Sequence, residues 1–335
     1  MVLNMTNSNG FVHTNDEGRV LACQNPETCP FGTAATTSER SQALYVEKVS
    51  ELLLSSSVVY DEERIKNRRY EIYNGIQYVA LKDMTASELG NCLVGAGRQL
   101  GFNDKKLESA IALATSLHEN QSRGARGTLK RTPYIEHPLR NAIRLIRLGN
   151  AEQDVIIANV LHDTVEDGSV DFVKKFAEDR FTDGRIDEVQ ARAMLEDYIE
   201  KRFGGRVLNA VHKVTNEYFS RRQWSELTQE EKADLYLNHV RNSIKNDPDA
   251  LLVKVSDFID NATGLYHSDV KGREKRTLRQ AKKYLPVASV FRDEIHNVSD
   301  LHVSDEGRRE ILLKMDRTEI RLRNIIRKYE SLGTR

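Results

Sequence analysis

The sequence predicts a mainly α-helical protein, a helical bundle with a small α+β or partly disordered N-terminal extension. Apolar residues recur three and four positions apart over much of the chain after residue 100, which is typical of amphipathic helices. A strand-like pattern occurs at 70–81, and polar residues dominate the first 40 positions. With 39% hydrophobic residues, the 335-residue chain can bury a sizeable core, as one large domain or two smaller ones.

Residues 1–40 are rich in Asn, Thr, Gly and Ser, and we expect them to form a flexible arm that carries Cys23 and Cys29. These two cysteines and His13 suggest a zinc site as an alternative. No fourth ligand stands at zinc-finger spacing, so a solvated tail is the preferred interpretation. The three cysteines of the chain do not make a disulfide framework.

Two segments lie between the arm and the C-terminal region. Residues 41–98 combine a helical stretch with a possible hairpin at Asn74-Gly75, which predicts a small α+β appendage of unassigned role. Residues 99–292 form the main helical domain, in which a charged amphipathic helix at 186–203 is expected to end at glycines.

Residues 293–335 are expected to contain a charged C-terminal amphipathic helix. Its apolar stripe should dock on the body or on a second subunit, which makes a homo-oligomer possible. Acids interleave with the bases of this helix, so a role at a membrane is not favoured. The stripe consists of Ile311, Leu312, Met315, Ile320, Leu322, Ile325, Ile326 and Tyr329.

The composition narrows the class of protein. Lys and Arg number 50 and balance 50 Asp and Glu, so the net charge gives no argument for a nucleic-acid or membrane partner. No long uncharged apolar stretch occurs, and the first residues are too polar for a signal peptide. We therefore expect a soluble cytoplasmic protein.

The most informative stretch surrounds His162 and Asp163. An apolar helix at 155–161 precedes this pair, and Glu166 and Asp167 follow it. On a continuing helix these polar groups are three and four residues apart and converge on one side. Acids near a helix C-terminus are disfavoured by the macrodipole, so the cluster predicts a bound cation.

Two other segments add candidate ligands. His137 stands where Pro138 begins a helix, and Asp257 and Asn261 are four apart on one helical face. Together with His162 and Asp163, His137 and Asp257 form a mixed nitrogen and oxygen set. Such a set suits manganese, iron or zinc better than calcium and leaves positions for water or substrate. His212 is a further candidate by residue type only, because a lone histidine on a helix is more often at the surface.

These motifs resemble the HD phosphohydrolase superfamily, and the flanking residues narrow the resemblance to the alarmone-hydrolase domain of the RelA/SpoT family. The resemblance covers about residues 100 to 290 and rests on four ordered blocks. They are Pro133-Tyr134-x-x-His137-Pro138, Leu161-His162-Asp163-Thr164-Val165-Glu166-Asp167, Lys213-Val214-Thr215 and Lys254-Val255-Ser256-Asp257-x-x-x-Asn261.

The resemblance implies an HD-domain fold and manganese-dependent hydrolysis of the 3′-pyrophosphate of guanosine tetra- and pentaphosphate, giving GDP or GTP and pyrophosphate. In this interpretation His137, His162, Asp163 and Asp257 hold the metal. Two acids, Glu166 and Asp167, orient and deprotonate the attacking water. Glu166 is the preferred base, and Asp167 is expected to hold a ligand histidine as well. Asn261 is expected to hydrogen-bond the substrate near Asp257.

Asn120-Gln121-Ser122-Arg123 resembles the family's Gly-Gln-x-Arg motif, whose arginine packs against the guanine base. Arg123 inherits that role by position, and a planar guanidinium suits it. The connection from 124 to 130 is longer and more basic than in the family. Arg126, Lys130 or Arg131 could therefore replace Arg123 or meet a phosphate, and a solvated basic loop is the alternative.

Synthetase domains follow the hydrolase domain in those members of the RelA/SpoT family that also make alarmones. The roughly 45 residues after Val290 are too few for one, so the chain resembles a stand-alone hydrolase. Two alternatives stay open. One is hydrolysis of another nucleotide, such as a 3′-pyrophosphorylated adenosine analogue. The other is an inactive fold that binds nucleotide while the N-terminal arm and the last helix recruit a partner.

Overall fold

The computed structural model describes the chain at 13–14, 20–21, 81–123, 131–177, 186–265, 273–331 and 333. The predicted hairpin at Asn74-Gly75, both arm cysteines, Arg126 and Lys130 lie outside the described residues. Two short strands, β1 (His13–Thr14) and β2 (Val20–Leu21), pair antiparallel within the first 40 residues.

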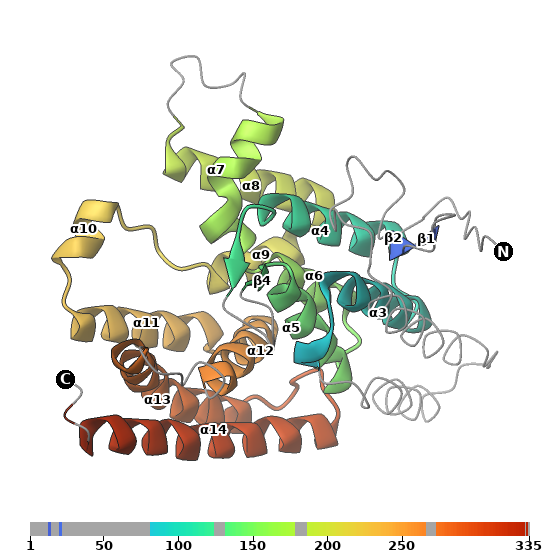
Figure 1. Cartoon of the computed structure of the whole chain (residues 1–335). Helices are drawn as coiled ribbons and strands as arrows, with labels where there is room; N and C mark the ends of the chain where they lie inside the picture. The colour runs from blue at the N-terminus through green and yellow to red at the C-terminus, as the bar shows by residue number, and fades with distance from the viewer. Residues whose placement is uncertain are drawn as a thin grey trace.

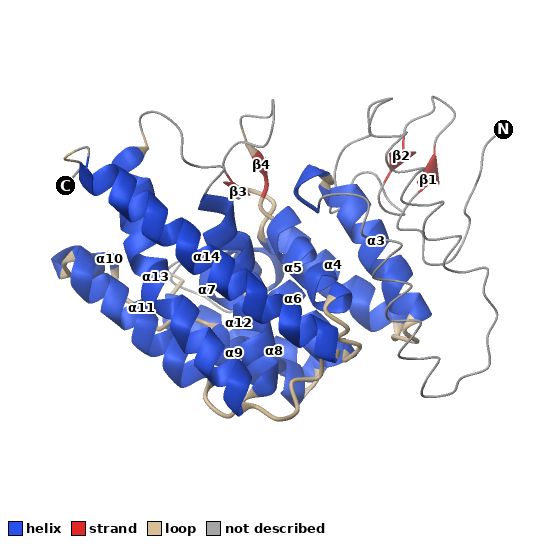
Figure 2. Ribbon diagram, turned by 90° about the horizontal axis from the view of Figure 1, so that it is seen from below, coloured by secondary structure: helices blue, strands red, loops and turns tan. Residues whose placement is uncertain are grey.

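Helices make up nearly all of the described chain, which confirms the predicted mainly α-helical fold (Figures 1 and 2). A short antiparallel pair, β3 (Ser122–Arg123) with β4 (Thr132–Pro133), precedes the central helices. In the described part of the chain the helices are η1 (Leu81–Asp83), α3 (Ala86–Gln99), α4 (Asp104–Leu117), α5 (Glu136–Arg147), α6 (Gln153–Leu161), α7 (Thr164–Phe176), α8 (Glu188–Phe203), α9 (Gly205–Val214), α10 (Arg221–Glu226), α11 (Gln229–Ile244), α12 (Pro248–Gly264), α13 (Glu274–Asn297) and α14 (Asp305–Ser331).

Local sequence signals explain several helix boundaries. Thr85 and Glu88 form a reciprocal capping box at the start of α3. Asp247 caps α12 by accepting from the backbone N–H of Ala250, and Pro248 occupies the first turn. The predicted helix at 186–203 is α8, and it ends as expected at Gly204, whose φ of 94° favours glycine.

Helix α12 lies at the centre of the molecule and packs against α5, α6, α9, α11, α13 and α14 (Figure 1). Its side chains Leu251, Val255 and Phe258 are fully buried. Because α12 is buried along most of its length, its polar side chains near the core are held in a rigid setting with little water.

The expected division at residue 98 remains a prediction, but α3, which lies before it, is part of the main core. Leu89 and Leu93 of α3 are fully buried and belong to the same apolar cluster as Leu139 of α5. Residues 86–98 therefore pack on the helices that carry the candidate site.

The C-terminal stripe docks on the body, which was one of its two expected positions. Ile311 and Met315 of α14 join the main core, whereas Leu322 and Tyr329 pack in a smaller cluster with Leu278 of α13. Ile320 is the exception within the predicted stripe, because it is 59% exposed. Association of two chains through α14 remains a prediction. Among the described residues no helix is both long and apolar enough to cross a membrane.

Candidate metal centre

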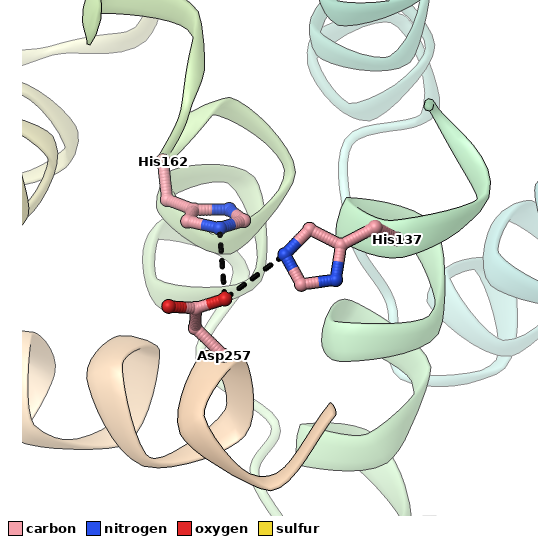
Figure 3. A group of neighbouring side chains, drawn as sticks. All are labelled: His137, His162 and Asp257. Carbon is pink, nitrogen blue, oxygen red and sulfur yellow. Dashed lines mark ion pairs between the residues drawn. The ribbon is translucent and has the colours of Figure 1, made fainter. Parts of the chain in front are cut away.

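Three parts of the fold bring imidazole and carboxylate groups to one point. His137 is the second residue of α5, His162 follows α6, and Asp257 lies in the middle of α12. Figure 3 shows their side chains turned toward one another. Oδ1 of Asp257 is 2.9 Å from Nε2 of His137 and 3.6 Å from Nε2 of His162. One donor atom from each of the three residues lies within 4.8 Å of the others, a spacing that can hold a metal ion.

Asp163 completes the predicted set of four. Its Oδ2 is 3.1 Å from Nε2 of His162 and 3.6 Å from Nε2 of His137. Both histidines are buried, while the two carboxylates keep a partly exposed edge. The sequence therefore selected four side chains that meet in space, although 120 residues separate the first from the last.

The hydrogen bonds of His162 show which of its nitrogens is available to a metal. Nδ1 is 2.8 Å from the backbone oxygen of Asn159. Because a carbonyl oxygen only accepts, Nδ1 carries a proton, and Nε2 is the nitrogen left to bind a metal. Nε2 is buried without a hydrogen-bond partner and faces the carboxylates. An unsatisfied imidazole nitrogen beside two carboxylates fits a divalent cation.

Electrostatics within the cluster are strong. Burial alone would lower the pKa of His162, but Asp163 and Asp257 outweigh burial and raise that pKa to about 10. Burial alone would raise the pKa of Asp257, but His137 and His162 hold it well below its usual value. A metal would bind here in competition with a proton on the imidazoles, so metal affinity should depend on pH.

The acids after Asp163 occupy a different position from the one expected. The sequence suggested one helix with its acids at the C-terminus, but α6 ends at Leu161 and α7 begins at Thr164. Glu166 and Asp167 therefore lie in the first turn of α7, where the macrodipole favours them. The macrodipole conflict used to infer a cation does not exist. The case for a metal rests on the converging ligands instead.

The two acids also have different partners. Glu166 accepts hydrogen bonds from the backbone N–H of Asn216 at 3.2 Å and from its side-chain Nδ2 at 2.7 Å. Asp167 lies 3.5 Å from the hydroxyl of Tyr134. Partial removal from water, and then the charges of Asp163 and Glu166, raise the pKa of Asp167 to about 7. Asp167 was expected to hold a ligand histidine, but the first turn of α7 directs its side chain toward Tyr134. Asp260 instead hydrogen-bonds a candidate ligand, His137.

Arg123 reaches the cluster from the end of β3. Its guanidinium donates to Oδ1 of Asn261 at 2.9 Å and lies 4.8 Å from the centre of the Tyr134 ring. Asn261 in turn donates to Oδ1 of Asp257 at 2.7 Å, so Arg123 is tied to a candidate ligand through one amide. The structure thus brings Arg123 and Asn261 together with the four candidate ligands.

The other sequence-based candidates lie elsewhere. Arg131 is exposed and donates at 3.4 Å to the backbone oxygen of Ser122, and Lys130 lies outside the described residues. His212 is 69% exposed and pairs with Glu196, as expected for a surface histidine.

Sequence reasoning missed four residues around the site: Tyr134, Arg140, Arg144 and Asp260. Tyr134 was part of a recognised motif but had no role, and its hydroxyl donates to Oδ2 of Asp163 at 2.8 Å. Asp260 could have been found from its spacing, because an acid three residues after Asp257 in an apolar helix shares its face.

The comparisons agree with the geometry. The HD-domain family model matches residues 110–288, which is more than half of the chain. A guanosine-3′,5′-bis(diphosphate) 3′-pyrophosphohydrolase from Aquifex aeolicus is 29% identical over 188 residues, covering 55% of this chain and 21% of that protein. A probable chloroplastic GTP diphosphokinase RSH2 from Oryza sativa is 22% identical over 67% of this chain and 28% of its own length.

The chain therefore spans less than a third of the length of either relative. One solved structure, of a metazoan SpoT orthologue described as hydrolysing ppGpp, aligns with a TM-score of 0.44 at 19% identity. That alignment covers 70% of this chain and 99% of the other. The match over residues 110–288 confirms the resemblance predicted from the four sequence blocks, and the chain belongs to the HD-domain family.

Proposed function

We propose that this chain is a metal-dependent hydrolase that removes the 3′-pyrophosphate of guanosine tetraphosphate and pentaphosphate, giving pyrophosphate and GDP or GTP. The observation that carries the proposal is the convergence of His137, His162, Asp163 and Asp257 with histidine Nε2 atoms facing inward. Similarity to a pyrophosphohydrolase of this specificity supports the choice of substrate.

These four residues would hold the metal, and manganese is the ion we propose. A divalent cation held there lowers the pKa of water and offsets the negative charge of a diphosphate. The protein would supply a proton acceptor in Glu166, whose carboxylate is held in place by two hydrogen bonds from Asn216. Asp167, on the same turn of α7, would orient the attacking water beside it.

Arg123 is the residue we propose for the nucleobase. Its guanidinium is held by Asn261 and lies over the ring of Tyr134, and the side chain remains 27% exposed. A planar cation fixed in this way can stack on a purine. Asn261 would hydrogen-bond the substrate beside Asp257. For Lys130 and Arg131 we propose contact with a phosphate of the substrate. A cytoplasmic location is part of the same proposal.

A 3′-pyrophosphorylated adenosine nucleotide is the second candidate substrate, because stacking on Arg123 does not by itself distinguish guanine from adenine. Initial rates of pyrophosphate release from ppGpp and ppApp, measured with the manganese-loaded protein, separate the two. We expect kcat/KM for the guanosine compound to be at least tenfold higher. Equal values, or a preference for adenosine, would contradict the proposed substrate. Tight binding of both nucleotides without turnover would favour the inactive, nucleotide-binding alternative.

A further inference from the structure

Asp260 lies one helical turn after Asp257 and contacts His137 at Nδ1, the ring nitrogen that faces away from Asp257. Its side chain is only 2% exposed, and its Oδ2 is 2.8 Å from Nδ1 of His137. Asp257 meets the same imidazole at Nε2, so α12 holds both nitrogens of His137 with two acids three residues apart. The two acids are not equivalent, because Asp257 also lies beside His162, at 3.6 Å from its Nε2.

Two arginines of α5 hold Asp260. Nε and Nη2 of Arg140 donate to its two oxygens at 3.1 and 3.0 Å, and Nη2 of Arg144 donates to Oδ1 at 2.8 Å. Bidentate arginine contacts fix the plane of a carboxylate as well as its position. We call these three residues the Asp260 clamp. Together with His137, Arg140 and Arg144 supply four donors, so Asp260 has little capacity left to bind a metal itself.

The clamp decides which group donates between Asp260 and His137. Three guanidinium N–H groups donate to the Asp260 oxygens and call for a carboxylate that only accepts, so the proton between the two residues resides on Nδ1 of His137. Nε2, on the side of Asp257 and Asp163, is then the nitrogen that can bind a metal.

Asn141 is compatible with the same tautomer. Its Oδ1 accepts from Nη1 of Arg144 at 2.7 Å, which fixes the orientation of the amide. Nδ2 of Asn141 therefore lies 3.3 Å from Nε2 of His137, a nitrogen that can accept from it when the ring proton is on Nδ1. Arg144 thus influences the imidazole through both Asp260 and Asn141.

We propose that Asp260, fixed by Arg140 and Arg144, is a positioning residue that holds the His137 ring in the tautomer able to bind metal through Nε2. This inference rests on the metal-dependent function proposed above. Outer groups of this kind orient metal-binding histidines and make them more basic. The structure gives Asp260 this role by geometry, although it is not itself one of the four ligands.

Asp260→Asn is the direct test. Arg140 and Arg144 only donate, so the amide oxygen should turn toward them and leave the NH2 group facing Nδ1 of His137. Nδ1 must then accept, the ring proton moves to Nε2, and His137 loses its metal-binding lone pair. We expect the dissociation constant for Zn2+, titrated into the stripped protein against a chromophoric chelator, to rise between 10- and 100-fold.

Asp249→Asn is the matched control. Asp249 is on the same helix and forms a similar bidentate pair with Arg206, but it contacts no candidate ligand. The Zn2+ affinity of Asp249→Asn should stay within about twofold of wild type. Circular dichroism of both variants shows whether each one is folded. Equal Zn2+ affinities for wild type and a folded Asp260→Asn would overturn the inference. Zn2+ binding by the wild type without hydrolysis of ppGpp would overturn the proposed function only.

A second measurement needs no change to Asp260. In a nitrogen-15 spectrum of the Zn2+-loaded wild type, the histidine signal absent from His137→Gln should show a protonated Nδ1 and a metal-bound Nε2. A protonated Nε2, or zinc bound through Nδ1, would overturn the inference even if Asp260→Asn fails to fold.

Discussion

The hydroxyl of Tyr134 donates a 2.8 Å hydrogen bond to Oδ2 of Asp163, the oxygen that faces the imidazoles of the candidate metal centre. Tyr134 is in turn fixed by stacking on His118, with ring centres 4.7 Å apart. Burial, followed by the charge of Asp163, raises the pKa of the Tyr134 hydroxyl above its ordinary range, so this group remains a donor at neutral pH. Asp163 is therefore positioned by a rigid aromatic side chain.

Tyr134→Phe should separate this hydrogen bond from the stacking. The ring remains, so the free energy of unfolding should fall by about 1 kcal/mol. Metal affinity should fall about tenfold, because Asp163 loses the donor that orients it. Urea unfolding and metal titration of the stripped protein measure the two effects. Unchanged affinity would show that Asp163 needs no support from Tyr134.

Glu166→Gln tests the proposed base. Glutamine can still accept from Asn216, so the side chain should keep its place while losing the ability to take a proton. We expect kcat for pyrophosphate release to fall at least 100-fold with metal binding retained. Asp171→Asn, one turn further along α7 and paired with Lys174, is the control and should keep the wild-type rate. A fully active Glu166→Gln would transfer the role of base to another group, with Asp167 the first to test.

His239 should make stability depend on pH. Burial, helped by the charge of Lys254, lowers its pKa from an ordinary 6.5 to about 4 in the folded chain. Between these values the unfolded chain binds more protons, so the free energy of unfolding should fall as pH drops from 6.5 toward 4. In His239→Gln, which keeps a donor for the backbone oxygen of Val214, the decrease should be smaller. Urea unfolding midpoints at pH 7 and pH 5 measure this decrease. The same change in midpoint for wild type and His239→Gln would contradict the lowered pKa of His239.

Alanine substitutions at Met315 and Ile320 test which side of α14 packs on the body. Met315 is fully buried in the main core, whereas Ile320 on the same helix is 59% exposed. Met315→Ala should cost about 2–5 kcal/mol of unfolding free energy, and Ile320→Ala should change it by less than about 0.5 kcal/mol. A large loss in Ile320→Ala together with concentration-dependent unfolding would instead indicate a second chain on that face.

The sequence-based candidate ligands converge in the structure for a physical reason. Residue types with metal chemistry are rare in apolar helices, so His137, His162 and Asp257 stood out before any contact was known. Periodicity also identified α8 and the buried part of α14.

The roles of the surrounding residues could not be read in the same way. The break between α6 and α7 carries no proline or glycine, so the sequence suggested one continuous helix and the wrong end for Glu166 and Asp167. The roles of Asp260 and Arg140 depend on their contact across α5 and α12, and these two residues are 120 positions apart in the chain. The spacing of Asp260 to Asp257 was a local signal for its position, but its contacts with Arg140 and His137 arise from packing and leave none.

The proposed metal-dependent hydrolysis can be measured as pyrophosphate release from ppGpp by the metal-stripped protein, with and without added Mn2+, for wild type and His162→Ala. We predict release that requires Mn2+ and is lost in His162→Ala. Release that is independent of metal, release retained in His162→Ala, or no release from wild type with Mn2+ demonstrably bound would contradict it.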